Sequence, residues 1–380
     1  MLSRVADCLY WLSRYVERAE NLARIIDVNS QVMLDLPWTH SQQLEENWLP
    51  LLACLDEDEA FIKTGRDFNR TSVTEYLVFD QENPNSIQRC LAAARENART
   101  VREQISTEMW EQINRAYLWS GSHAARDLFE RNQYEFFQQI KETSQLFQGI
   151  TDASMLHGEG WDFIQFGKFI ERADKTSRVL DDKYHLLSPA RQKQPHLEVM
   201  EWTAVLRSCS ARQAYQRVYV AAVKPQCVAD LLLLNEVFPR SVRFCVERID
   251  RSLRLISGVK EDHFSNAAEK LTGRLVAELR FSEIEDFYER GLHDAVDDIQ
   301  VQLNRIDGAV FQTYIFPARV TEPPLSGAAA TVVENNAPRA LAQSHSQSQS
   351  QSQSQNSAEV WQDQPQQQQQ QRRSPRFSFK

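Results

Sequence analysis

The first 26 residues of the chain repeat apolar side chains at alternating steps of three and four residues. The series consists of Leu2, Val5, Leu9, Leu12, Val16, Ala19, Ala23 and Ile26. This spacing places all of them on one face of an α-helix, whereas a β-strand would alternate every second residue. A helix with one apolar face buries that face against other elements, as in a helical bundle. The pattern predicts one long amphipathic helix that ends before Pro37, which lacks a backbone donor.

Helical periodicity recurs along the rest of the chain up to about residue 316. Helices are predicted at 41–55, 72–80, 86–105, 107–119, 123–156, 160–186, 198–222, 227–235, 241–257 and 263–315. No segment alternates as a strand does, and glycine is scarce at 11 residues, as expected for long helices. Ser86 and Ser241 each stand two residues after a proline and are predicted to begin helices as N-caps. The predicted fold class is therefore all-α.

Two segments match each other at an offset of 155 residues. Residues 73–90 read "VTEYLVFDQENPNSIQRC" and residues 228–245 read "VADLLLLNEVFPRSVRFC". The ungapped match pairs Pro84 with Pro239, Ser86 with Ser241 and Cys90 with Cys245. Because similar sequences adopt similar packing, we predict one internally duplicated helical domain. Its halves would be 1–156 and 157–316, related by an approximate twofold axis.

A charged motif, Glu-Arg-x-acid-x-x-x-Arg, occurs three times, as "ERAENLAR", "ERADKTSR" and "ERIDRSLR". On a helix its first, fourth and eighth positions share one face, so each copy forms a line of two acids and an arginine. An offset of 154 residues overlays the first two copies, while the third overlays residues 92–99, where only the final arginine remains. The candidate site residues are Glu17, Arg18, Glu20, Arg24, Glu171, Arg172, Asp174, Arg178, Glu247, Arg248, Asp250 and Arg254.

The motif is compatible with two structural interpretations. In the first, each acid forms a surface ion pair with the arginine four residues later, worth about 0.2 to 0.5 kcal/mol. Such pairs are easily replaced, so their retention in both halves favours a second interpretation, a buried network. In that network Glu17 would meet Arg172 while Glu171 meets Arg18. Breaking one partner of such a pair would cost about 3 to 5 kcal/mol.

A third interpretation is a chemical site. Convergent carboxylates from several bundle helices hold metals in di-metal proteins, but those sites add histidines in a Glu-x-x-His spacing that this chain lacks. No residue is assigned as a metal ligand, although a magnesium or manganese site built only from oxygens stays open. Alternatively, the arginines would bind the carboxylate and the acids the amine of a peptide or amino acid. The sequence identifies no cofactor and no catalytic residue.

Composition limits the partners and the location. The net charge is −9 and no long basic stripe is present, so nucleic acid is not an expected partner. The six cysteines show no C-x-x-C spacing, which favours reduced, buried thiols and a cytoplasmic location. The N-terminal segment contains charged residues at Arg4 and Asp7, so neither a signal peptide nor a membrane span is expected.

The composition changes after about Pro317. The segments "SQSQSQSQSQ" and "QPQQQQQQ" cannot bury enough apolar surface to offset the entropy of ordering them. A disordered tail is therefore predicted for 317–380.

Three segments resemble the bacterial alpha-E domain family. They are "MLSRVADCLYWLSRYVERAENLARII", "GWDFIQFGKFIERADKTSRVL" and "FPRSVRFCVERIDRSL", and the resemblance covers about 1–316. It implies an all-helical protein whose genes often neighbour, or are fused with, those of ATP-grasp-like ligases and transglutaminase-like cysteine peptidases. The positions that match the family motif are Glu17, Arg18, Glu20, Arg24, Glu171, Arg172, Asp174 and Arg178.

The resemblance sets two expectations for function. The first is a noncatalytic partner or substrate-presenting module of an ATP-grasp-associated system for peptide synthesis or modification. The ligase and the peptidase would then be its partners. The alternative is an enzyme or ligand-binding protein that uses the acid and arginine clusters as a peptide or amino-acid site, with or without an oxygen-ligated divalent metal.

Overall fold

The computed structural model describes residues 1–35, 48–186, 195–220, 222–260 and 263–316. These ranges form helices and contain no β-strand, which confirms the all-α class. None of the described helices is both long enough and apolar enough to cross a membrane. The predicted disordered tail and the start of the helix predicted at 41–55 lie outside the described residues.

The helices fall into two successive series. The first series is α1 (Ser3–Asp35), α3 (Trp48–Leu55), α4 (Asp58–Lys63), α5 (Arg70–Val78), α6 (Ile87–Thr100), α7 (Thr107–Ser120), α8 (His123–Arg131) and α9 (Gln133–Ser154). The second series is α10 (Glu159–Leu186), α11 (Pro195–Ser208), α12 (Arg212–Tyr219), α13 (Pro225–Leu234), α14 (Val242–Ser257), α15 (Ala267–Phe281), α16 (Ile284–Glu289), α17 (Leu292–Val310) and the π-helix η2 (Phe311–Ile315).

Three of the predicted helices are broken into shorter ones, and α4 was not predicted. Asn132 separates α8 from α9, because its side chain accepts a hydrogen bond from the backbone of Glu135 and caps the second helix. The predicted helix at 198–222 is interrupted near Ser210, which has a positive φ of 53°. The predicted helix at 263–315 ends first at a capping box that begins with Glu283. Apolar periodicity continues across such breaks, so it cannot reveal them, whereas capping side chains and left-handed residues end helices locally.

The two predicted serine N-caps are confirmed. The hydroxyl of Ser86 accepts a hydrogen bond from the backbone of Arg89, and the hydroxyl of Ser241 accepts one from the backbone of Phe244. Each serine also donates to a carbonyl six residues earlier, that of Asp80 or Asn235. The matching segments at offset 155 therefore share the same local hydrogen bonds.

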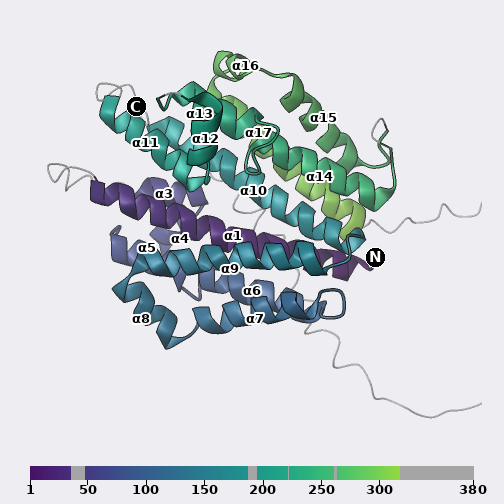
Figure 1. Cartoon of the computed structure of the whole chain (residues 1–380), viewed down its shortest axis with the longest axis horizontal. Helices are drawn as coiled ribbons and strands as arrows, with labels where there is room; N and C mark the ends of the chain where they lie inside the picture. The colour runs from purple at the N-terminus through teal and green to yellow at the C-terminus, as the bar shows by residue number, and fades with distance from the viewer. Residues whose placement is uncertain (36–47, 187–194, 221, 261–262, 317–380) are drawn as a thin grey trace, which may run out of the picture. The chain divides into compact units, whose positions relative to one another are not determined.

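Helices α1 and α10 pack along each other and form the centre of the described structure (Figure 1). Helices α6 and α9 pack against α1, while α14 and α17 pack against α10. The order of packing is thus the same in both series, which favours the predicted duplication at 1–156 and 157–316. The duplication and its twofold axis stay predictions, because a shared order of helices does not by itself establish a common origin.

The two central helices approach each other closely at Gly167 of α10. A Cβ atom added to Gly167 would lie 2.3 Å from the backbone oxygen of Tyr10 in α1. No side chain other than hydrogen fits at this distance, and a rotamer change cannot relieve a clash with backbone. This glycine therefore sets the separation of the two helices, and with it the reach of the charged side chains beside it.

We predict that Gly167→Ala costs about 3 kcal/mol of folding free energy or more, because the methyl group must push two helix backbones apart. The matched control is Gly149→Ala in α9, where an added Cβ meets nothing within 4 Å. That change is expected to stabilise the protein by about 0.5 to 1 kcal/mol through helix propensity. Urea denaturation followed by circular dichroism measures both, and equal effects of the two substitutions would contradict the close contact.

Candidate functional site

Two reciprocal arginine–glutamate pairs join α1 to α10. The Nε and Nη2 atoms of Arg172 lie 2.8 Å from Oε1 and 2.8 Å from Oε2 of Glu17. The same two atoms of Arg18 lie 2.7 Å from Oε1 and 3.0 Å from Oε2 of Glu171. Both pairs are bidentate forks, the strongest geometry for a guanidinium and a carboxylate. The exposed fractions of the four residues are between 0 and 8%, so the predicted buried contacts are confirmed.

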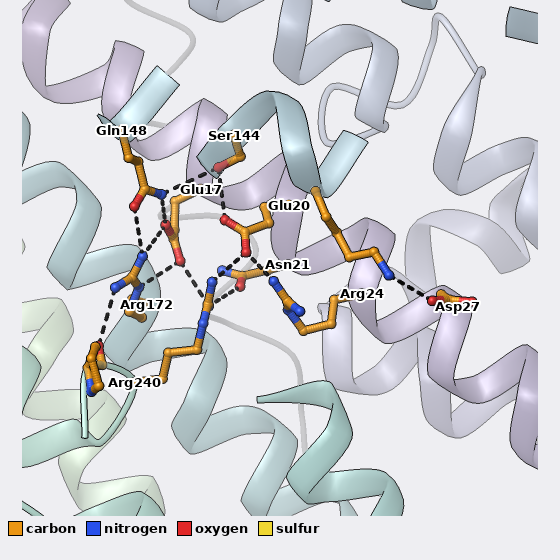
Figure 2. A network of polar contacts seen from close by, with 11 residues as sticks. Glu17, Glu20, Asn21, Arg24, Asp27, Ser144, Gln148, Arg172 and Arg240 are labelled. Atoms are coloured by element: carbon orange, nitrogen blue, oxygen red, sulfur yellow. Dashed lines mark hydrogen bonds and ion pairs between the residues drawn. The ribbon is translucent and has the colours of Figure 1, made fainter. Parts of the chain in front are cut away.

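Glu17 uses all of its capacity to accept hydrogen bonds. Besides Arg172, its Oε1 accepts from Arg240 at 3.0 Å and its Oε2 accepts from Gln148 at 2.8 Å (Figure 2). Its two oxygens therefore accept four hydrogen bonds, which fills their lone-pair sites. No acceptor site is left on this carboxylate for a ligand amine or a metal ion.

Glu20 lies beside Glu17 and belongs to the same network (Figure 2). It forms ion pairs with Arg24 on its own helix and, at 2.6 Å, with Arg240. The hydroxyl of Ser144 in α9 donates to its other oxygen at 2.8 Å. Three guanidinium groups thus surround the two glutamates of the first motif copy, one from α1, one from α10 and one from the segment before α14.

Glu171 has a different set of donors on the other side of the α1–α10 contact. Besides Arg18, it accepts a hydrogen bond from Nε of Arg14 at 2.9 Å. Arg14 in turn forms an ion pair with Asp307 of α17 at 3.2 Å and donates to the hydroxyl of Tyr10 at 2.6 Å. The two central glutamates are therefore bound in both cases by arginines of the opposite central helix, but their outer partners differ.

The guanidinium groups determine the protonation of both glutamates. Burial alone would raise the pKa of Glu17, but Arg172 and Arg240 outweigh it and lower that pKa to about 2. Burial likewise opposes ionisation of Glu171, and Arg18 and Arg14 nevertheless hold its pKa well below the ordinary value. Both carboxylates are ionised across the physiological pH range, so neither is available as a general base that cycles its proton.

A partly buried lysine, Lys168 of α10, borders the network. Burial and the neighbouring Arg172 lower its pKa to about 8, while Glu17 and Asp152 act in the opposite direction. The offset of 154 residues overlays Lys168 on Arg14. The arginine position is therefore occupied in the second series by a weaker base.

The rest of the second motif copy forms a local pair. Asp174 and Arg178 lie 3.0 Å apart on α10, in the i,i+4 arrangement, and Lys175 lies 3.4 Å from Asp174. The adjacent guanidinium helps to lower the pKa of Asp174, against the effect of burial. This pair corresponds to Glu20 and Arg24 of the first copy.

The third motif copy does not join the central network. It lies on α14, where Glu247 pairs with Arg243 and Arg280, and Asp250 pairs with Arg254. The guanidinium of Arg248 lies 4.8 Å from the ring centre of Phe244. The ion pairs of the third copy therefore stay within α14 or reach α15, and none of them involves Glu17 or Glu171.

Sequence reasoning missed several members of the network. They are Tyr10, Arg14, Ser144, Gln148, Arg240 and Asp307. Arg14 lies within the quoted stretch of the first helix, and Arg240 overlays Asn85 in the offset-155 match. This replacement of an asparagine by an arginine within two matching segments was the signal that could have identified Arg240. The other missed residues belong to no repeated motif.

The described part of the chain contains no group of three or more histidine, cysteine, aspartate or glutamate side chains placed to hold a metal ion. It contains all six cysteines, and no disulfide joins any of them. The contacts of the network itself are those of charges paired with one another. Through these ion pairs the network holds α1 and α10 together in a fixed register.

The family model that matches residues 1–315 is Alpha-E, described as a predicted α-helical domain with a conserved ER motif. The chain belongs to the Alpha-E family. The dipeptides Glu17-Arg18 and Glu171-Arg172, which form the reciprocal pairs, fit that description. Curated relatives are uncharacterized proteins of Mycobacterium bovis and Mycobacterium tuberculosis, each 26% identical over 303 residues. The match covers 75% of this chain and 33% of each relative, so the chain spans about a third of their length. No solved structure matches the chain.

We predict that Glu17→Gln destabilises this Alpha-E domain by about 3 to 5 kcal/mol, because it leaves the buried guanidinium of Arg172 without its counter-ion. Adding Arg172→Met should cost clearly less than the sum of the two single changes, since both charges are then removed. The control is Glu96→Gln, whose side chain is exposed and pairs with Arg99 at 2.8 Å. Because surface pairs contribute about 0.2 to 1 kcal/mol, this control should lower the free energy of unfolding by no more than that. Urea denaturation measures all four variants, and strict additivity at the central pair would contradict the assigned contact.

The lowered pKa values also predict an acid sensitivity. A carboxylate whose folded pKa is depressed contributes stability above its unfolded pKa of about 4.3 and loses it as the pH falls through the folded pKa. For Glu17 the loss lies between about pH 5 and pH 2 and amounts to about 3 kcal/mol. The free energy of unfolding should fall steeply across this range. In the variant Glu17→Gln with Glu171→Gln the slope should be visibly flatter, and an unchanged slope would show that other carboxylates dominate it.

Proposed function

We propose that this Alpha-E domain is a noncatalytic partner or substrate-presenting module of an ATP-grasp-associated system for peptide synthesis or modification. We place it in the cytoplasm, with an ATP-grasp-like ligase and a transglutaminase-like peptidase as partners. Nucleic acid is not among the proposed partners, since the net charge of −9 opposes phosphate binding.

The proposal that the domain is noncatalytic rests on Glu17, because every hydrogen-bond acceptor site of its carboxylate is occupied by protein donors. A catalytic carboxylate needs a free lone pair or a proton to exchange at the moment of reaction. Glu17 instead accepts four hydrogen bonds from Arg172, Arg240 and Gln148, and its exposed fraction is 0%. This arrangement supports a structural role for the most conspicuous motif of the chain.

The partner part is supported by the size of the relatives. In the mycobacterial proteins the matched region makes up only 33% of their own length, so the Alpha-E region is joined there to further polypeptide. Segments that share one chain are held at high effective concentration, which suits a module that acts together with another domain. We propose that the Alpha-E domain of the present chain likewise acts together with a second protein domain.

The test is a reconstitution with the ATP-grasp-like ligase and the transglutaminase-like peptidase of the same genome. Sedimentation velocity should show a complex with at least one of them, and adding the Alpha-E protein should raise turnover of a peptide substrate. The Alpha-E protein alone should convert no peptide. Failure to form either complex would contradict the proposal.

The variant Glu17→Gln with Glu171→Gln separates a module from an enzyme. At a temperature where circular dichroism shows that the variant is folded, a module should still bind its partner and enhance turnover, although the melting temperature is lowered. If the clusters are an active site, the variant should lose all turnover while its melting temperature stays nearly unchanged.

A further inference from the structure

A hollow of about 580 Å³ lies between the first turns of α10 and the outer face of α14. We refer to it as the α10–α14 hollow. Three buried polar residues contribute to its lining, namely Asp162, Gln165 and Ser252, with exposed fractions of 5%, 6% and 4%. Oδ1 of Asp162 and Nε1 of Trp161 are buried without a hydrogen-bond partner in the described structure. Because buried polar groups are normally paired, unpaired ones beside a hollow indicate a missing partner.

The walls of the α10–α14 hollow are aromatic. Trp161 and Phe169 come from α10 and Phe244 from α14. The ring of His157 stacks on Trp161 with 4.3 Å between ring centres, and Nε1 of Trp161 is buried without a partner. Aromatic and apolar walls with a few polar groups are typical of sites for small organic ligands, and the volume falls within their usual range of about 300 to 1,000 Å³.

Two arginines of the third motif copy, Arg248 and Arg251, border the α10–α14 hollow. Both are exposed, and among the described residues neither forms an ion pair or donates a hydrogen bond from its side chain. In the other two motif copies the arginine of the Glu-Arg dipeptide holds a carboxylate in a bidentate fork. The third copy therefore presents the same group at an open hollow, with no protein carboxylate bound to it.

The packing of the helices does not require these arginines. At the offset of 155 residues, Arg248 overlays Ala93 and Arg251 overlays Glu96. Helix α6 packs on α1 with this alanine and this acid in place, as α14 packs on α10. The basic pair is thus particular to the second series, where the hollow lies.

We propose that the α10–α14 hollow binds a short peptide through a carboxylate held by Arg248 and Arg251. The buried acid and amide behind them would pair with a peptide N–H and C=O, and the aromatic walls would pack on an apolar side chain. Inorganic phosphate fits the hollow less well, because it has no apolar side chain to pack on the aromatic walls. Burial raises the pKa of Asp162 to about 6, so near neutral pH it is largely ionised and accepts hydrogen bonds. The inference rests on the proposed function in one respect, since the peptide would be the substrate that the module presents.

The test is fluorescence anisotropy of a dansyl-labelled tetrapeptide with two glutamates, one phenylalanine and a free C-terminal carboxylate. We expect saturable binding to the full chain, weakened about tenfold or more by Arg248→Gln with Arg251→Gln, because charge-assisted hydrogen bonds are lost. The matched control is Arg274→Gln with Arg305→Gln, which removes the same charge from exposed positions outside the hollow and should leave affinity unchanged. A peptide with glutamines and a C-terminal amide should bind about as weakly as the first variant binds the acidic peptide.

Equal affinity of the wild type and the Arg248→Gln, Arg251→Gln variant would overturn the assignment, as would the absence of saturable binding. Equally effective competition by inorganic phosphate would identify a general anion site and would also overturn it. Both double variants change only exposed side chains, and circular dichroism checks that they fold. The reconstitution with the ligase and the peptidase is a separate experiment. If the peptide binds but no complex forms, only the proposed partnership is refuted. If a complex forms but the peptide does not bind, only the proposed peptide site in the α10–α14 hollow is refuted.

Discussion

The two reciprocal arginine–glutamate ion pairs between α1 and α10 are the interaction on which the rest of the structure depends. Transferring an ionised side chain from water into a protein interior costs several kcal/mol, and the attraction between opposite charges offsets this only when the geometry is close to ideal. The bidentate forks between Glu17 and Arg172 and between Arg18 and Glu171 meet that condition. They do so because Gly167 lets the two helix backbones approach within the reach of these side chains.

Much of this arrangement follows from the sequence. The apolar spacing of the first helix places Glu17 beside the core, and the offset of 154 residues that overlays Glu17 on Glu171 predicts that each glutamate meets the arginine of the other motif copy. The N-caps at Ser86 and Ser241 follow from local chemistry alone. These features depend on short-range spacing or on comparison within the chain, both of which are visible in one sequence.

The outer shell of the network does not follow from the sequence. Gln148 and Asp307 reach the centre from α9 and α17, and their positions depend on how those helices cross the central pair. A single glutamine or aspartate on a helix gives no indication of which carboxylate or guanidinium it will meet. The same limit applies to the helix breaks, where one capping residue such as Asn132 outweighs an apolar pattern that continues on both sides.

The reciprocal pairs have a consequence for how the chain folds as a unit. Each central glutamate receives its fork from the other series of helices, so neither series contains the counter-ion of its own buried acid. A fragment that ended between α9 and α10 would hold Glu17 without Arg172, and its complement would hold Glu171 without Arg18. Each fragment would thus lack the counter-ion of its central acid. We therefore expect the two series to stabilise each other across this contact, as the subunits of a heterodimer do.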